Sequence, residues 1–286
     1  MAVPFTKIQG AGNDYIYLDG IGAALPPGDP ADWARRLSDR HFGVGGDGII
    51  LVLRGESAPF RMRMYNADGS EGDMCGNGMR GFAKFVLEQG YIKEPVFDVE
   101  TGAGLIRPHA EVSPDGRVHR VRVDMGTPRL RRGEVPMAGA PDGQAREEPL
   151  PLPDGREIAV TAVSMGNPHA VVFLGRPPVD ADVLGDGPLL ERHPAFPRRA
   201  NVEFIQVLGP NELRMRVWER GSGETLACGT GACASLVAAS LTGRTGRAAT
   251  VHLLGGDLEI EWSEADGHVY LSGPTVEVFR GSYDPR

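Results

Sequence analysis

The chain has 286 residues, of which 41% are hydrophobic and 24% charged, and its net charge is −8. This length is enough for two domains with separate cores, and the surplus of acidic residues argues against nucleic acid or an anionic membrane as a main partner. No apolar stretch approaches ~18 residues and the N-terminus has no apolar export-signal region, so we expect a cytoplasmic protein that acts on a small molecule.

The first predicted elements are a strand and a short helix. Gly12-Asn13 opens an apolar, β-rich run. In residues 29–41, Trp33 and Leu37 lie four residues apart, which is typical of a helix with one buried side. We expect this helix to be part of the scaffold.

A Cys-Gly-x-Gly motif at residues 75–78 is followed by apolar residues at helical spacing. The motif recurs at residues 228–231, after an alternating pattern that predicts a strand over 213–218 and before a helix predicted from Cys233. Each thiol is therefore expected where a loop enters a helix and several backbone N–H groups lack intrahelical partners. Such a place binds carboxylates and favours the thiolate form of a cysteine.

Two segments are predicted to be connections that carry no catalytic or binding residues. Residues 131–156 are rich in Pro, Gly and charge and have no apolar periodicity, which predicts a surface excursion. Residues 176–200 have no counterpart earlier in the chain, and we expect one short helical turn or two there, around Leu189 to His193.

The two cysteine motifs belong to an internal repeat. Residues 61–78 align without a gap with residues 214–231, at an offset of 153. Further matches occur at offsets of 153 or 154, and they are Gly12-Asn13 with Gly166-Asn167, Asp47 with Asn201, and Gly102 with Gly255. We therefore expect an α/β (α+β) fold of two pseudo-symmetric mixed-sheet halves, each with a helix after its Cys-Gly-x-Gly motif.

Two similar halves that each present a thiol predict an active site in the cleft between them. A racemase or epimerase removes a hydrogen from one face of a carbon and returns one to the other face, so it uses an acid/base group on each side. The repeat therefore favours this reaction class. The three cysteines have no metal-ligand spacing and no cofactor signature is present, so we expect free thiols, no metal and no cofactor. Cys233, on the apolar face of its helix, is expected in the core.

Eight motifs, in order, resemble those of the diaminopimelate epimerases, which interconvert LL- and meso-diaminopimelate without a cofactor. They cover essentially the entire chain, and they are GAGNDYI, DRHFGVGGDGI, YNADGSEGDMCGNG, SMGNPHAV, RRANVEF, VWERGSGETLACGTGACA, GGDLEIEW and SGPTVEVF. The resemblance implies two α/β halves, residues 1–126 with 274–286 crossing back, and residues 127–273. It also implies a homodimer that serves lysine and peptidoglycan precursor biosynthesis.

The resemblance also implies the roles of individual residues. Cys75 and Cys228 would be the catalytic pair, and the backbone amides of Gly76-Asn77 and Gly229-Thr230 would hold the carboxylate at the reacting carbon. The residues that match the family's substrate-contacting positions are Asn13, Asn66, Asn167, Asn201, Glu219 and Arg220. His169 and Glu219 match residues that tune the two thiols.

Some motif residues have a plainer interpretation or depart from the family pattern. Glu219 and Arg220 would suit a solvated ion pair at a strand end, but their place in the motif favours substrate binding. The asparagines also suit turns, and Asp14 and Asp68 are expected to be structural. The departures are Gln9 for His, Gly48 for Gln and Leu254 for Pro, and Gly48 predicts one missing substrate contact.

Three other functions remain open at this point. A proline or hydroxyproline racemase also has paired cysteines, but its first motif typically has His where this chain has Asn77. A cysteine hydrolase or acyl transferase would use Cys228 as nucleophile and His169 as base, which leaves Cys75 unexplained. A binding protein without catalysis has no need of thiols.

Overall fold

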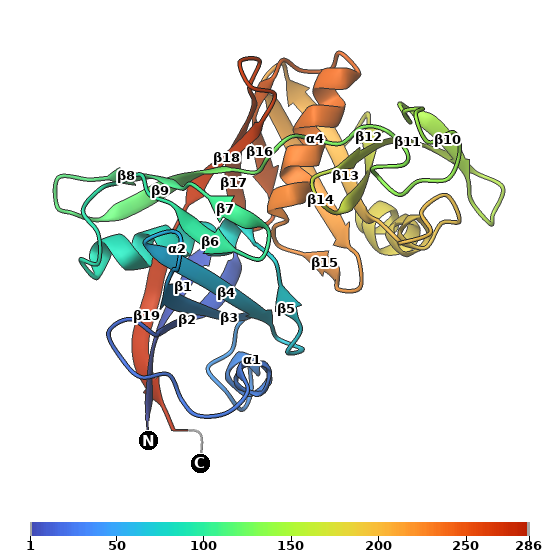
Figure 1. The fold of residues 1–286 in the computed structure, drawn as a ribbon. Coiled ribbons are helices and arrows are strands. Elements are labelled where there is room, and N and C mark those ends of the chain that lie inside the picture. Colours follow the sequence, from blue (N-terminus) through green and yellow to red (C-terminus); the bar gives the residue numbers. More distant parts are fainter. Residues whose placement is uncertain (1, 285–286) are drawn as a thin grey trace. The chain divides into compact units, whose positions relative to one another are not determined.

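The computed structural model describes residues 2–284 and divides into two compact units. The first unit comprises the chain up to Asp124 together with the residues from Ser272 onward, and the second unit comprises Met125–Leu271. Figure 1 shows that each unit consists mainly of strands with a few helices. The mixed α/β fold predicted from the repeat is confirmed.

The first unit is built on one mixed sheet. Its strand order is β19 (Val276–Tyr283), β1 (Val3–Gly10), β2 (Asn13–Asp19), β3 (Gly48–Arg54), β4 (Phe60–Asn66), β6 (Val99–Thr101) and β7 (Gly104–Ile106), and β5 (Glu71–Gly72) pairs with β4. The helices are α1 (Pro30–Ser38) and α2 (Gly76–Glu88), and β8 (His109–Val112) and β9 (Val118–Asp124) form an antiparallel pair. The final strand, β19, thus lies antiparallel to β1.

The second unit repeats this plan with additions. Its strand order is β10 (Glu148–Pro151), β11 (Glu157–Ser164), β12 (Pro168–Leu174), β13 (Asn201–Gly209), β14 (Glu212–Glu219), β16 (Ala248–Leu253), β17 (Gly256–Trp262) and β18 (Val269–Pro274), and β15 (Gly223–Thr225) pairs with β14. The helical elements are the π-helix η1 (Ala181–Asp186), α3 (Gly187–Glu191) and α4 (Gly229–Leu241).

The repeat is visible as one arrangement of elements found in both units. In the first unit β2 and β3 are parallel, β3 and β4 antiparallel, and the short β5 leads into α2. In the second unit β12 and β13 are parallel, β13 and β14 antiparallel, and β15 leads into α4. Each cysteine motif therefore follows the same strand and turn.

The local sequence explains these elements. In β14, Leu213, Met215 and Val217 are buried on one face, which confirms the predicted alternation. Asp29 caps α1 by accepting a hydrogen bond from the amide of Ala31, and the helix predicted within 29–41 is confirmed. The helix predicted from Cys233 begins four residues earlier, at Gly229, because the small motif residues enter the first turn.

The interpretation of residues 131–156 as a surface excursion is wrong. This segment contains β10 and contributes buried residues to the core of the second unit, and they are Val135, Met137, Ala145, Leu150 and Leu152. Pro and Gly between them break any period, so each apolar side chain enters the core singly and the sequence carries no regular pattern. Helical structure in residues 176–200 begins earlier than the turns predicted around Leu189 to His193, because η1 continues into α3.

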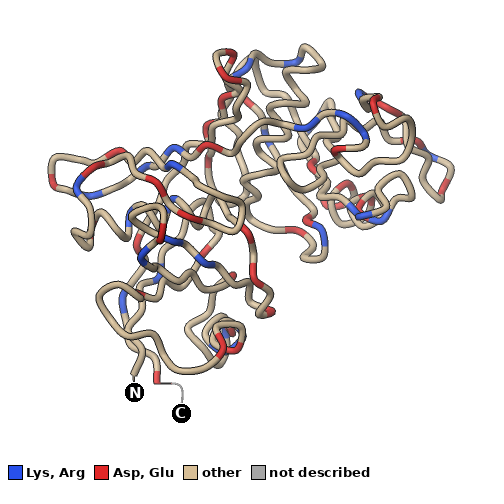
Figure 2. The backbone as a smooth tube through the Cα atoms, viewed as in Figure 1, with Lys and Arg blue, Asp and Glu red and all other residues tan. Residues whose placement is uncertain are grey.

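Charge is distributed along both units without a large one-sign stretch. Figure 2 shows acidic and basic residues interspersed along the backbone. Among the described residues, no helix is long and apolar enough to cross a membrane.

Candidate functional site

Cys75 lies at the start of α2, as the sequence predicted. It is the N-cap residue, with φ −137° and ψ 122°, and its Sγ accepts a hydrogen bond from the amide of Gly78 at 3.4 Å. The hydroxyl of Tyr15 donates to the same sulfur at 3.7 Å, and the thiol lies 3.7 Å from Oδ1 of Asn13. The first thiol therefore has a phenol and an amide beside it.

Cys228 has the same place in the second unit. It is the N-cap of α4, with φ −130° and ψ 110°, and its Sγ accepts from the amide of Gly231 at 3.4 Å. Oγ1 of Thr230 lies 3.5 Å from the sulfur. The two repeats thus present their thiols with closely similar backbone geometry. By contrast, Cys233 is fully buried in α4, which confirms its predicted place in the core.

The second glycine of each motif, Gly78 or Gly231, packs so closely against a neighbouring strand that a side chain would fit only if a neighbour moved. A Cβ atom at Gly78 would lie 2.7 Å from Cδ1 of Ile50. A Cβ atom at Gly231 would lie 2.7 Å from Oε1 of Glu203 and 3.2 Å from the Cys228 sulfur. Contacts this short require a neighbour to move, so each close helix-to-strand approach depends on glycine.

The helix amides favour the thiolate form, since hydrogen bonds from Gly78 and Gly231 lower the pKa of Cys75 and Cys228, but burial has the larger and opposite effect. Burial raises the pKa of Cys75, and the amide of Gly78 only partly offsets this. Burial raises the pKa of Cys228 well above its usual range, and the carboxylates of Glu219 and Glu203 add to the effect. Desolvation of a charged sulfur outweighs the helix amides here.

Asparagines 13, 66 and 77 lie in different local networks of the first unit. Asn13 donates to Oδ2 of Asp47 at 2.6 Å, and Asn66 donates to Oγ of Ser70 at 3.0 Å. Asn77 is buried and its Oδ1 accepts from the Arg80 guanidinium at 2.6 Å. Asn13 beside the Cys75 sulfur and Asn77 within the motif therefore both have fixed side chains.

Asp14 and Asp68 have structural contacts. Asp14 forms ion pairs with Lys7 and Arg40, each at 2.7 Å, and Arg40 also pairs with Asp47 at 2.9 Å. Hydrogen bonds from Arg40 and Lys7 lower the pKa of Asp14 even though burial opposes them. Asp68 accepts from the amide of Ser70 at 2.8 Å, which closes a turn.

His169, Asn167 and Thr230 form one chain of hydrogen bonds that ends beside Cys228. His169 is fully buried, with Nδ1 at 2.6 Å from Oε1 of Glu203 and Nε2 at 2.9 Å from Oδ1 of Asn167. Asn167 in turn donates to Oγ1 of Thr230 at 3.3 Å. The contacts therefore lead from a buried carboxylate to the residue beside the thiol.

Glu219, Arg220 and Asn201 lie at the adjoining strand ends. Asn201 accepts from the backbone amide of Arg220 at 2.9 Å and donates to the carbonyl of Pro168 at 3.2 Å. Glu219 accepts a hydrogen bond from Thr225, and burial raises its pKa. The guanidinium of Arg220 donates to the carbonyl of Arg198 at 3.2 Å. Glu219 and Arg220 thus have separate partners, which differs from the plain ion pair that the sequence also allowed.

Two residues beside the thiols were not singled out from the sequence. Tyr15 and Glu203 lie in apolar strand runs, Tyr15 within DYIYLD and Glu203 within NVEFIQV. The signal for Glu203 was a lone carboxylate in such a run, because a fully buried acid is rare unless it is paired. Tyr15 stands at the position that corresponds to His169 in the repeat, at an offset of 154.

The departures from the family pattern have local explanations. Oε1 of Gln9 accepts from the amide of Gly12 at 3.0 Å and so supports the turn before Asn13. A Cβ atom at Gly48 would lie 2.2 Å from the carbonyl oxygen of Tyr65, so this backbone has no room for a side chain there. Leu254 is 56% exposed, so Leu in place of Pro does not alter the packing of the core.

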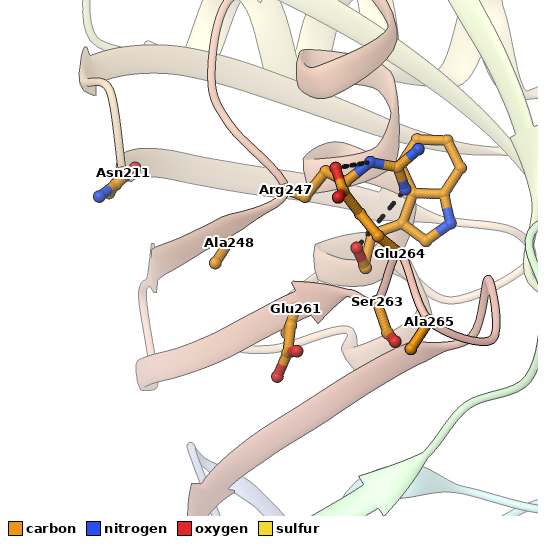
Figure 3. A pocket seen from close by; sticks show the side chains of 8 residues that line it. Asn211, Arg247, Ala248, Glu261, Ser263, Glu264 and Ala265 are labelled. Carbon is orange, nitrogen blue, oxygen red and sulfur yellow. Dashed lines mark hydrogen bonds and ion pairs between the residues drawn. The ribbon is translucent and has the colours of Figure 1, made fainter.

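A surface hollow elsewhere in the second unit does not coincide with these residues. Its volume is about 510 Å³, and it is lined by residues 247–248 and 261–265 together with Asn211 (Figure 3). Arg247 stacks on Trp262 at 3.9 Å and pairs with Glu264 at 3.3 Å. In this hollow Arg247 is already paired with Glu264, and no thiol lines it. The cysteine motifs are therefore the better candidate for the active site.

Comparison with known proteins gives one family over nearly the whole chain. The family model described as diaminopimelate epimerase matches residues 5–131 and 161–278. A diaminopimelate epimerase of Moorella thermoacetica is 53% identical over 279 residues, covering 98% of each chain. Another, of Pelotomaculum thermopropionicum, is 54% identical over 285 residues, covering 99% of each chain.

Solved structures share the fold at low identity. A phenazine biosynthesis protein of the PhzF family from Bacillus anthracis has a TM-score of 0.72 at 16% identity and covers 99% of both chains. A probable proline racemase from Agrobacterium radiobacter has a TM-score of 0.70 at 18% identity, covering 99% of this chain and 93% of the other.

Proposed function

The chain belongs to the diaminopimelate epimerase family, and we propose that it interconverts LL- and meso-diaminopimelate with Cys75 and Cys228 as its acid/base pair. The observation that carries the assignment of the pair is the matched N-cap geometry, in which each sulfur accepts an amide hydrogen bond at 3.4 Å. A duplicated thiol at the start of a duplicated helix is what a two-sided proton transfer needs.

In this proposal one sulfur removes the α-hydrogen as a thiolate while the other donates a proton to the opposite face of the same carbon. The bond from carbon to the first hydrogen breaks, its electron pair stays on the carbon, and that pair then takes the proton of the second thiol. Each sulfur ends in the protonation state that the other had at the start. The reverse reaction therefore begins with the roles exchanged.

The α-hydrogen is very weakly acidic, so the negative charge that develops must be stabilised by fixed dipoles. The amides of Gly76-Asn77 and Gly229-Thr230 lie in the first turns of α2 and α4, where backbone N–H groups lack intrahelical acceptors. We assign them to the substrate carboxylate. Preorganised donors of this kind commonly give the largest single contribution to catalysis.

Substrate binding also has to supply the thiolate. Burial raises the pKa of both thiols, so forming a thiolate costs free energy. The α-ammonium group of a bound amino acid places a positive charge beside the sulfur, and a nearby opposite charge lowers a thiol pKa. We therefore propose that the reactive thiolate is formed mainly in the complex.

The distal part of diaminopimelate carries a second ammonium and a second carboxylate. We assign Glu219 and Arg220 to these charges, and Asn13, Asn66, Asn167 and Asn201 to neutral hydrogen bonds with the substrate. His169 and Glu219 are assigned to tuning Cys228. Arg220 is exposed, which leaves its guanidinium able to reach a ligand.

We propose that the enzyme is a cytoplasmic homodimer that serves lysine and peptidoglycan precursor biosynthesis. The reaction makes meso-diaminopimelate, which is a substrate for both. Three free cysteines suit a reducing compartment.

The test is turnover with LL-diaminopimelate as sole substrate, followed by chromatographic separation of the isomers, with L-proline and a simple thioester as parallel substrates. We expect interconversion of the diaminopimelate isomers alone. Racemisation of proline with no action on diaminopimelate would favour the proline racemase alternative, and thioester hydrolysis would favour a cysteine hydrolase.

A further inference from the structure

The surroundings of the two thiols differ beneath the helices even though their backbones match. In the first unit the side chain packed against the second motif glycine, Gly78, is Ile50. In the second unit the corresponding neighbour of Gly231 is Glu203, which is fully buried. A carboxylate thus replaces an aliphatic group under only one of the two thiols.

Burial of this carboxylate is unfavourable for stability. Within the described part of the chain, Oε2 of Glu203 has no hydrogen-bond partner, and Oε1 is held by the ring of His169 at 2.6 Å. A buried polar atom without a partner destabilises a fold, whereas an aliphatic group in the same place would not. The first unit demonstrates that the fold tolerates an aliphatic group there, because Ile50 occupies that place.

The hydrogen bonds of His169 determine where its protons lie. Nε2 lies 2.9 Å from Oδ1 of Asn167, and the amide nitrogen of Asn167 donates to Oγ1 of Thr230 at 3.3 Å. An amide oxygen only accepts, so Nε2 of His169 carries a proton. The second ring nitrogen faces Glu203, and one further proton is shared between Nδ1 and Oε1 at 2.6 Å.

The same contacts orient the side chains that lie between His169 and Cys228. His169 donates to the oxygen of Asn167, which turns its NH₂ group toward Thr230. Because Oγ1 of Thr230 accepts from that group, its own hydroxyl proton is free to point at the sulfur 3.5 Å away. In the first unit a single contact supplies the hydroxyl donor, since the hydroxyl of Tyr15 donates directly to the sulfur of Cys75 at 3.7 Å.

Resting on the proposed function, we propose that Glu203 is a positioning residue for the second thiol: by holding the His169 ring with its Nε2 proton toward Asn167, it aims the hydroxyl of Thr230 at the sulfur of Cys228. Glu203 acts through three side chains and touches no reacting atom. The orientation that it imposes depends on a hydrogen-bond partner at Nδ1, whereas the negative charge of Glu203 acts separately, by raising the pKa of Cys228.

That distinction gives matched variants. In Glu203→Gln the amide nitrogen can donate to Nδ1, so the ring keeps its proton on Nε2 and the chain of hydrogen bonds survives. In Glu203→Leu no partner remains at Nδ1, so only the contact of Nε2 with Oδ1 of Asn167 is left to hold the ring. Asp186→Asn serves as the control, because Asp186 is another buried acid of the second unit and pairs with Arg156 at 2.6 Å.

The functional readout is kcat and KM for both diaminopimelate isomers. We expect Glu203→Leu to lose about tenfold in kcat, the worth of one hydrogen bond to a charged group, and Glu203→Gln and Asp186→Asn to stay within about threefold of the parent. Equal losses in the Gln and Leu variants would overturn the proposal, since charge would then matter and not orientation.

The second readout is independent of turnover. In ¹⁵N-histidine-labelled full-length protein, with His169→Asn used for assignment, we expect a slowly exchanging proton on Nε2 of His169 in the parent, in Glu203→Gln and in Asp186→Asn. We expect rapid exchange of that proton in Glu203→Leu. An unprotonated Nε2 in the parent, or an unchanged proton in the Leu variant, would overturn the proposal even if the parent proved inactive on diaminopimelate, so the two failures are distinguishable.

Discussion

The repeat offers a matched pair of substitutions, Gly78→Ala and Gly231→Ala, that tests how tightly the second thiol is held. Both glycines lie in the first turn of a helix, where Ala is favoured over Gly by up to about 1 kcal/mol. At Gly78 the new Cβ meets the end of the Ile50 side chain at 2.7 Å. A terminal methyl can rotate away, so the two effects nearly cancel.

At Gly231 the obstacle cannot move in the same way. The new Cβ would lie 2.7 Å from Oε1 of Glu203, which is held by His169 at 2.6 Å, and 3.2 Å from the Cys228 sulfur. Overpacking of this kind destabilises by about 1–3 kcal/mol, and the helix preference offsets only part of it. We expect a net loss of about 1–2 kcal/mol, which lowers the melting temperature by about 2–6 °C for a chain of this size.

We expect Gly231→Ala to lower kcat strongly even though its effect on the free energy of unfolding is modest. Displacing a reacting group by about 1 Å can reduce a rate by roughly a hundredfold, so Gly231→Ala is expected to lose about that factor in kcat while Gly78→Ala loses less than tenfold. Thermal melts followed by circular dichroism and initial rates in both directions provide the comparison. If Gly231→Ala were as stable and as active as Gly78→Ala, Glu203 would not be packed tightly against the second cysteine motif.

The remaining predictions concern the thiols. Cys75→Ala and Cys228→Ala should each abolish epimerisation in protein that still melts cooperatively, whereas Cys233→Ala should remain active, and near-normal rates in either of the first two would end the two-base mechanism. Because the pKa of Cys228 is raised in the folded protein, the folded state keeps its proton where the unfolded state loses it, so this thiol contributes stability that is complete below the ordinary thiol pKa of about 8.5 and declines as pH rises above it. The melting temperature should therefore fall between roughly pH 8.5 and 10 in the parent, and it should fall less in Cys228→Ala; equal slopes would contradict the burial argument.

Features that rest on local pattern could be predicted from the sequence. The repeat placed both cysteines where a loop enters a helix, and in the structure both are N-cap residues. The alternation around Leu213 and the spacing of Trp33 and Leu37 likewise gave a strand and a helix. Each of these patterns is set by residues that are neighbours in the chain.

Features that rest on tertiary burial were missed. Leu150 and Leu152 enter the core from a Pro-rich segment, and only the surrounding sheet determines this. The rise in the thiol pKa values also comes from desolvation by distant parts of the chain, so the motif alone suggested the opposite direction. In the sequence Glu203 is one polar residue in an apolar strand, and its role depends on a tertiary contact with His169 that no local pattern indicates.

The central claim, that two thiols act on opposite faces of one carbon, is tested most directly by the fate of deuterium at low conversion. LL-diaminopimelate is incubated with the enzyme in D₂O, and both isomers are recovered before equilibrium and examined by mass spectrometry. We expect the meso product to carry one deuterium at the inverted carbon and the remaining LL substrate to carry none, because the incoming proton comes from a thiol already exchanged with solvent. Deuterium appearing in recovered LL substrate as fast as in product would show that a single group serves both faces, and it would contradict the account.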